Sequence, residues 1–330
     1  MPFKIIGSPH PKYLAATDIL ISDMSNISYD FLLYNRPIIL IANKWVRGKM
    51  PDFGIKTDLE GLDAAIKESI ENPKGFEKQR RLWHKKTMYM PDGKSAYRVL
   101  DMIIEKSGIT NPYILFFHGD NDVSKVHLDP LFSAAQEKLV SCEFTSFFDE
   151  KLYSSKKGLL IVSTHNNILD DIKYGYRVHI DHSVKGKGVT DFNSLSQLYK
   201  EKEYYRNTDL QVTEGEISFE NTKILMGPLK DRVIMAGYPK SDTLLKYNTA
   251  ENKDQVYKEL GLKNDMILIT YAPTGKYRYP FKQGASLSKE MLNRLKKIAK
   301  TNDYNVLVKL RSKETLYEKM SKIVNRFFRK

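Results

Sequence analysis

A short polar turn between two apolar runs is the first segment of the chain with the residue types to bind a ligand. Ser25 and Asn26 follow the strand-like run Ile19–Ser22 and precede a stretch with helical spacing. In a βαβ unit such a turn opens a helix, and its free backbone amides can bind an anion at the carboxyl end of the strand. An exposed helix start contributes only ~0.3–1 kcal/mol, so a phosphate would need further hydroxyl or cationic contacts.

Asp30 lies about one helical turn beyond this segment, where a carboxylate could reach a ribose hydroxyl. In the alternative interpretation, Ser25 only caps the helix and Asp30 is a solvated acid. The spacing by itself favours that alternative.

Two further segments have residues suited to loops near a ligand. Thr274 and Gly275 follow the run Met266–Tyr271 and allow either a backbone turn beside a ligand or an ordinary exit from a strand. The segment Asp92–Ser95 reads DGKS, which is similar to the end of a GxxxxGKS/T phosphate loop. It lacks the upstream glycine and strand, so we exclude that motif.

The elements that must position these residues are short apolar runs separated by stretches with helical spacing. Strands that alternate with helices are typical of parallel sheets built from βαβ units, so the sequence predicts an α/β fold with flanking helices. The predicted strands are Ile19–Ser22, Pro37–Ala42, Tyr113–Phe117, Gly158–Ser163, Arg177–Ile180, Asp231–Ala236, Met266–Tyr271 and Asn305–Leu310.

Two polar joints, Ser107–Pro112 and Tyr247–Asp254, divide the chain into pieces 1–108, 112–250 and 262–330. At 330 residues the chain is long enough for two domains with separate cores.

The amino-acid composition of the chain excludes several classes of protein and of binding site. The chain is 41% hydrophobic and 28% charged, as in folded soluble proteins. Its apolar runs are far shorter than the roughly 20 residues of a membrane helix, and its start lacks the apolar core of a signal peptide, so we expect a cytoplasmic protein. Cys142 is the single cysteine, which excludes an internal disulfide and a multi-cysteine metal site.

A net charge of +13 attracts phosphates, whether in a nucleic acid, an anionic lipid or a small substrate. The aromatic residues are dispersed and form no stacking stripe, so nucleic-acid binding would rest on charge alone. A solvated basic surface accounts for most of the local clusters. These clusters are Lys78–Arg81 with Lys85–Lys86, Lys185–Lys187 and Arg326–Lys330.

Several motifs together carry a resemblance to a known family. The segment from Ala16 to Leu40, ATDILISDMSNISYDFLLYNRPIIL, resembles the signature of the CDP-glycerol glycerophosphotransferases. Further similar segments are Asp92–Ser95 with Arg98, His182 with Lys187, Gly237–Asp242 (GYPKSD) and Tyr271–Thr274 (YAPT). The resemblance implies two Rossmann-like domains of the GT-B type.

The order of these motifs differs from that of the family, because the Ser25 segment comes first here. The chain therefore resembles a circular permutant or a cut from a longer tandem protein. The resemblance then predicts one nucleotide-donor-binding domain from 1–105 plus 262–330, and an acceptor-side domain from 112–250. We expect residues 305–330 and 1–22 to pack side by side, since nearby termini make a permutation tolerable.

The resemblance also implies an activity. Such enzymes transfer glycerol phosphate, or a related polyol phosphate, from a CDP-activated donor to a hydroxyl of a lipid-linked teichoic-acid-like or capsular polymer, and release CMP. We therefore expect a peripheral protein on the inner face of the cell membrane, and a basic surface gives a physical reason for attachment to anionic lipid.

The resemblance assigns roles to individual residues. His182 would be the catalytic base, because a histidine near its ordinary pKa can accept a proton at neutral pH. The other predicted contacts are to the donor or its phosphates: Ser25, Asn26, Thr274, Lys187, Lys309, Arg311 and Arg98, with Asp30 near the ribose.

The chain departs from the family at two places. Ser183 stands where the family usually has a glycine after its histidine, and the segment Lys309–Arg311 stands where the family has Arg-x-His-Pro. The second family histidine is therefore absent. Arg311 could bind a phosphate bidentately, but it cannot act as a base at neutral pH.

No cofactor is required by this scheme, although Mg²⁺ could accompany the donor diphosphate. The remaining histidines show no spacing that suggests a metal site. Two alternatives remain open. One is a GT-B glycosyltransferase that uses a sugar nucleotide, and the other is a noncatalytic or incomplete fragment of a tandem transferase.

Overall fold

The computed structural model describes most of the chain, in two compact units. One unit contains residues 1–83 with 247–330, and the other contains residues 84–246. The described residues are 3–7, 10–23, 25–41, 50–119, 122–164, 169, 172–181, 207–273, 289–301 and 304–309.

The first unit is built on a six-stranded sheet in the order β1-β12-β11-β2-β3-β4, and its neighbouring strands are all parallel. The neighbouring buried strands β2 and β3 read ILIS and IILI, as expected where both faces of a parallel sheet are covered. The strands are β1 (Phe3–Ile6), β2 (Ile19–Ser22), β3 (Ile38–Ile41), β4 (Ile55–Thr57), β11 (Leu268–Ala272) and β12 (Asn305–Lys309).

Alternate residues of these strands face two different helix layers. Ile269 and Tyr271 of β11 pack in one core with side chains of α4 (Leu62–Glu71) and α14 (Lys289–Thr301). Leu268 packs in the other with α1 (Pro11–Ala16) and α13 (Ala250–Leu260). This two-residue alternation buries both faces of the sheet.

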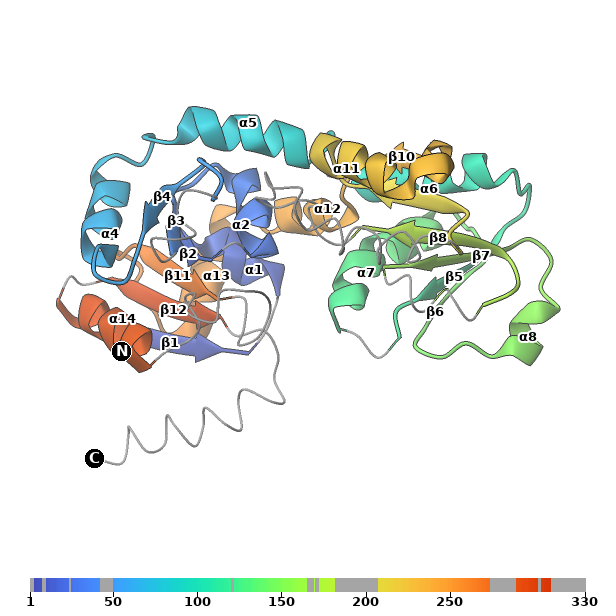
Figure 1. Cartoon of the computed structure of the whole chain (residues 1–330). Helices are drawn as coiled ribbons and strands as arrows, with labels where there is room; N and C mark the ends of the chain where they lie inside the picture. The colour runs from blue at the N-terminus through green and yellow to red at the C-terminus, as the bar shows by residue number, and fades with distance from the viewer. Residues whose placement is uncertain are drawn as a thin grey trace. The chain divides into compact units, whose positions relative to one another are not determined.

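The two ends of the sequence meet in this sheet. β1 pairs with β12, with Ile5 in register with Val308 (Figure 1, where the two strands have the opposite ends of the colour scale). If β11 and β12 are counted before β1, the strand order becomes 3-2-1-4-5-6, the order of doubly wound dinucleotide-binding sheets. The predicted packing of residues 305–330 against 1–22 is confirmed for the described residues.

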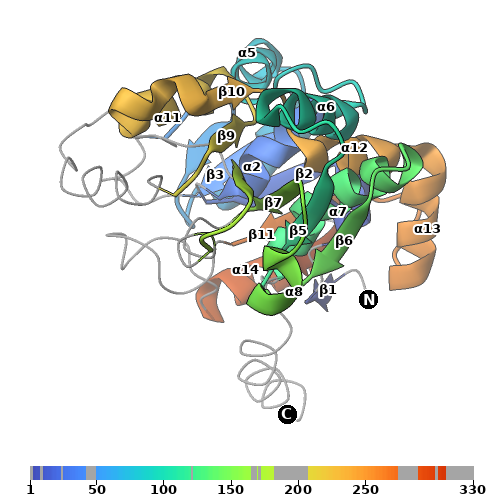
Figure 2. The same ribbon diagram turned by 90° about the vertical axis from the view of Figure 1, so that its right-hand side faces the viewer.

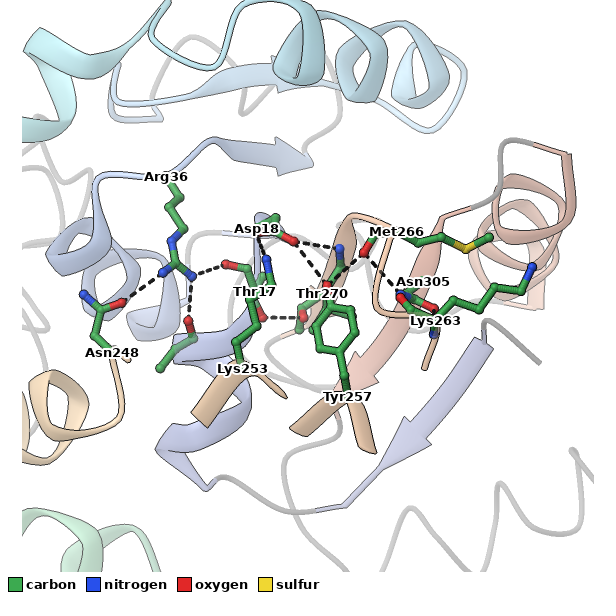
Figure 3. Close-up of polar contacts among 12 residues, drawn as sticks. Thr17, Asp18, Arg36, Asn248, Lys253, Tyr257, Lys263, Met266, Thr270 and Asn305 are labelled. Carbon is green, nitrogen blue, oxygen red and sulfur yellow. Dashed lines mark hydrogen bonds and ion pairs between the residues drawn. The ribbon is translucent and has the colours of Figure 1, made fainter. Parts of the chain in front are cut away.

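Polar contacts at the amino edge of the sheet also join the two sequence segments of the first unit, residues 1–83 and 247–330 (Figure 3). The carboxylate of Asp18, just before β2, accepts hydrogen bonds from Lys253 Nζ at 2.7 Å and from the backbone N–H of Leu268 at 2.9 Å. Arg36 donates to the carbonyl of Thr17 at 2.7 Å and to Asn248 Oδ1 at 2.9 Å.

The second unit has a parallel six-stranded sheet in the order β10-β9-β8-β7-β5-β6, with β6 at one edge (Figure 2). α6 (Ser95–Ser107) and α7 (Asp122–Glu137) cover one face, and Tyr153 of α8 (Glu150–Ser154) packs on the other. The strands are β5 (Tyr113–Phe117), β6 (Cys142–Thr145), β7 (Leu159–Ser163), β8 (Tyr176–Ile180), β9 (Leu210–Thr213) and β10 (Val233–Met235).

The remaining helices lie between successive strands along the chain. They are α2 (Asn26–Phe31), α5 (Glu77–Thr87), α11 (Glu216–Met226) and α12 (Pro239–Lys246), with 3₁₀ turns at Leu32–Tyr34 and Gly227–Arg232. No helix in the described ranges is long and apolar enough to cross a bilayer.

The predicted α/β fold with parallel sheets and flanking helices is confirmed. The joint at 107–112 lies between α6 and β5, but the polar stretch at 247–254 becomes helical from Ala250, where Thr249 caps α13. The predicted domains, 1–105 plus 262–330 and 112–250, differ from the two units at residues 84–105 and 247–250. The helix α6 packs on the second sheet, and residues 247–250 belong to the first unit.

Candidate functional site

The first sheet has a topological switch point between β11 and β2. From β11 the chain winds outward through β12, and from β2 it winds outward in the other direction through β3. Ligands of doubly wound sheets bind outside the carboxyl ends of the strands at such a point. Here the carboxyl ends are joined by the Ser22 hydroxyl, which donates to the carbonyl of Ala272 at 2.9 Å.

Ser25 and Asn26 lie directly after β2, at this switch point. Ser25 occupies the position before α2, but its hydroxyl makes no hydrogen bond to the first-turn amides. The Oδ1 atom of Asn26 is buried and has no hydrogen-bond partner in the described part of the chain. Ser25 therefore has the cap position without a capping hydrogen bond from its side chain, and a buried polar acceptor lies beside it.

Asp30 is in the second turn of α2 and is only 4% exposed. The alternative interpretation of a solvated acid is therefore wrong. Burial, and next the nearby carboxylate of Asp30, raise the pKa of Tyr34. The predicted contact of Asp30 with a ribose stays a prediction.

Lys309 ends β12 at the same edge of the sheet. Val308 is in register with Tyr271, which places Lys309 beside Ala272, the residue in register with Ser22. With two strand spacings between them, the backbones of Lys309 and Ser22 are about 10 Å apart. The Ser25–Asn26 segment and the cation Lys309 thus both lie at the carboxyl edge of the sheet, around the switch point.

Tyr271 fills the space beneath this edge. Its side chain is fully buried in the core of the first unit. Burial, with a smaller effect of Asp23, raises the pKa of its phenol, which therefore stays protonated at neutral pH.

Four of the predicted site residues, His182, Lys187, Thr274 and Arg311, lie outside the described residues. The described chain nevertheless reaches the residues that precede two of them. Pro273 follows β11 directly, and Asp181 follows β8.

Buried acids at the carboxyl edge of the second sheet were not among the predicted site residues. Asp181 follows β8 and is 1% exposed, and Glu214 follows the neighbouring β9 and is 2% exposed. His179 lies 3.9 Å from Asp181 and shares a hydrogen bond of 2.6 Å with Gln211. The position of Asp181 directly after the predicted strand Arg177–Ile180 was a sequence signal for that acid, whereas Glu214 had none because β9 was not predicted.

Arg98 anchors segments of the second unit. Its guanidinium donates to the carbonyls of Ala236 and Met90 at 3.0 and 2.7 Å, to both oxygens of Asp92 at 3.1–3.2 Å, and to Ser95 Oγ at 3.2 Å. Two of these bonds run from Nη1 to the two oxygens of the one Asp92 carboxylate. The described role of Arg98 is thus to join segments of the second unit, and its contact with a donor phosphate stays a prediction.

The GYPKSD and DGKS segments meet around this arginine. The carboxylate of Asp242 accepts hydrogen bonds from the backbone amides of Ser95 at 3.0 Å and Ala96 at 2.7 Å, and so caps α6 from another segment. Gly237 has a φ of +115°, and a Cβ there would lie 3.1 Å from the carbonyl oxygen of Tyr89. These two family-like motifs therefore hold the second unit together.

Within the described ranges, no group of three or more His, Cys, Asp or Glu side chains could hold a metal ion. An accompanying Mg²⁺ stays a prediction.

Comparison with known proteins tests the resemblance. Searches among curated proteins and among solved structures find no match. The model of the CDP-glycerol:poly(glycerophosphate) glycerophosphotransferase family matches residues 9–105 and 148–320, which is most of the chain. The matched ranges include the switch-point segment and the segments around Arg98 and Asp242. The chain therefore belongs to the CDP-glycerol:poly(glycerophosphate) glycerophosphotransferase family.

Proposed function

We propose that this protein transfers glycerol phosphate, or a related polyol phosphate, from a CDP-activated donor to a hydroxyl of a lipid-linked teichoic-acid-like or capsular polymer. The family match supports the transferase class. The observation that carries the donor site is the Ser25–Asn26 segment, which follows β2 at the switch point and has a buried acceptor without a partner in the described chain.

The donor binds at the carboxyl edge of the first sheet in this proposal. Ser25 and Asn26 contact the diphosphate together with Lys309, and Asp30 contacts the ribose. Arg311 and Thr274 add contacts from the segments that follow β12 and β11. A hydroxyl, an amide and cations together supply the contacts that the short helix α2 could not supply by itself.

The chemistry is attack by an acceptor hydroxyl oxygen on the phosphorus that carries the glycerol. A new P–O bond forms, the bond from that phosphorus to the oxygen of CMP breaks, and CMP leaves with the electron pair. His182 takes the hydroxyl proton, and Lys187, five positions later in the sequence, stabilises the phosphate charge. The family resemblance supports these two roles.

The two α/β units correspond to the two domains of a GT-B transferase, with the second unit on the acceptor side. Because the acceptor is lipid-linked, the protein works at the inner face of the cell membrane. The net charge of +13 supports reversible attachment to anionic lipid.

Calorimetric titration tests the donor site. CDP-glycerol, CMP, UDP-glucose and GDP-mannose are titrated into the native chain, the Ser25→Ala variant and a control, Ser155→Ala. Ser155 is an exposed serine of the second unit whose hydroxyl only donates to the carbonyl of Leu152. We expect CDP-glycerol to bind best, and Ser25→Ala to weaken that binding by roughly 10–150-fold, as for loss of a hydrogen bond to a charged group.

Each of the other possible results of this titration would lead to a different conclusion. A preference for a UDP or GDP sugar would replace the proposal with a glycosyltransferase. No binding of any nucleotide would identify an incomplete part of a larger enzyme. Equal losses in both variants would remove Ser25 from the donor site. If CDP-glycerol binds, loss of glycerol phosphate transfer with retained binding in His182→Ala is the expected sign of the base.

A further inference from the structure

The exposed face of α5 carries a row of cations that the donor site does not use. Lys78, Arg81, Lys85 and Lys86 are all exposed; we name this set the α5 basic face. In a helix, residues three and four positions apart lie about 5–6 Å from one another on one side, so Lys78, Arg81 and Lys85 form a continuous row. Lys86 lies beside this row, one turn beyond Leu82.

The opposite face of α5 is anchored in the first unit. Arg80 is 2% exposed and donates to Asn35 Oδ1 at 3.1 Å and to the carbonyl of Pro73 at 2.8 Å. Trp83 donates to Asp52 at 2.5 Å, and its ring packs edge-on against Phe53. These contacts fix the rotation of the helix, so the basic face lies on the side of α5 opposite Arg80 and Trp83.

Little of this charge is neutralised locally. Glu77 is the one acid in α5, and it pairs with Arg81 at 2.7 Å. Lys78, Lys85 and Lys86 have no ion pair in the described part of the chain. A fixed row of cations in which only Arg81 is paired is complementary to a linear anion with regularly spaced charges.

We propose that the α5 basic face binds the phosphodiester backbone of the growing polyol phosphate polymer. This inference rests on the proposed function, since that reaction makes such a chain. A bilayer is a poorer partner, because an interfacial helix needs a broad apolar face and this one exposes only Leu82 among the cations. A nucleic acid is also a poorer partner, because the aromatic ring of α5, Trp83, packs inward and provides no stacking surface.

The test compares two triple variants by fluorescence anisotropy with labelled poly(glycerol phosphate). The first is Lys78→Glu/Lys85→Glu/Lys86→Glu. The matched control is Lys230→Glu/Lys246→Glu/Lys258→Glu, which changes the net charge equally but at exposed lysines of three separate elements. Thermal unfolding of both variants establishes that they fold.

We expect the α5 variant to bind the polymer roughly 10–100-fold more weakly at low salt, and its salt dependence to flatten by about two units of log K per log salt for three lost contacts. The control variant should stay within about threefold of the native chain. In a transfer assay, the α5 variant should make shorter products with an unchanged rate of the first transfer.

Several results would overturn the inference. The first two are an equal loss of polymer binding in the control and unchanged polymer binding in the α5 variant. The third is tighter binding of single-stranded DNA than of the polymer by the native chain at equal phosphate concentration. The fourth is an α5 variant that binds anionic vesicles more weakly but binds the polymer as the native chain does. Failure of the proposed function would be visible separately, because CDP-glycerol titration needs no polymer and polymer binding needs no donor. Folded protein that binds the polymer but not CDP-glycerol would retain this inference and refute the donor site.

Discussion

Asp18 and Lys253 form an ion pair at 2.7 Å, although 235 positions separate them in the sequence. The same carboxylate accepts the backbone N–H of Leu268 and so ties the start of β2 to β11 (Figure 3). The first unit therefore depends on side chains from both ends of the sequence.

The first prediction concerns this junction. Asp18→Ala leaves the Leu268 amide and Lys253 without their acceptor, so we expect the free energy of unfolding of the first unit to fall by about 1–3 kcal/mol. Urea unfolding followed by tryptophan fluorescence measures it. The control is Asp63→Ala, which removes a more exposed ion pair with Arg294. That ion pair also joins residues 1–83 to residues 247–330. The control substitution should cost under about 1 kcal/mol, and an equal cost for both variants would contradict this account.

The second prediction concerns pH. Glu259 of α13 accepts hydrogen bonds from Lys12 at 2.5 Å and Tyr13 at 2.6 Å, and the bond from Lys12, followed by that from Tyr13, lowers the pKa of Glu259 from its ordinary value of 4.5. A carboxylate whose pKa is lower in the folded state stabilises the fold above its unfolded pKa, and this stability is lost as the pH falls through the folded pKa.

We therefore expect Glu259→Gln to be less stable than the native chain at pH 7, by an amount small for so exposed a pair. The difference should shrink as the pH is lowered below about 4.5. Thermal unfolding from pH 7 to pH 3 measures it. Glu290→Gln, an exposed acid whose side chain makes no described ion pair, is the control. A difference that grows toward acid pH would contradict the assignment.

The third prediction separates two roles of Arg98. A lysine there cannot replace a guanidinium that donates to several carbonyl and carboxylate groups, so Arg98→Lys should lower the stability of the second unit by roughly 1–3 kcal/mol. We expect the affinity of the folded variant for CDP-glycerol to be unchanged. Arg81→Lys, at an exposed position, is the control for stability. Weaker donor binding by folded Arg98→Lys would instead place a phosphate on this arginine.

The fourth prediction concerns the membrane. If the basic surface attaches the protein to lipid, co-sedimentation with anionic vesicles should be strong at low salt and should vanish at high salt, because counterions screen exposed charges. Neutral phosphatidylcholine vesicles are the control and should retain little protein. Retention that resists salt, or an equal retention on neutral vesicles, would refute electrostatic attachment.

Much of the fold could be predicted from local pattern. β2 and β5 have the predicted bounds. Each of these elements carries its own signal, as an apolar run or periodic stretch bounded by polar or turn residues. β1, β4, β6 and β9 were not predicted, because strands of three or four residues are stabilised chiefly by neighbours far away in the sequence.

The sequence by itself determined the α/β class, the family and the segment that follows β2, because strand periodicity and contiguous motifs are properties of neighbouring residues. The motif order predicted that the two ends pack side by side, but only the tertiary structure decided that they do so by pairing β1 with β12. It alone also decided that α6 packs on the second sheet and that Arg98 donates to carbonyls of its own unit. It also decided that Asp30 and Asn26 Oδ1 are buried. Burial, strand pairing and the choice of hydrogen-bond partner depend on residues distant in the chain, and no local pattern encodes them.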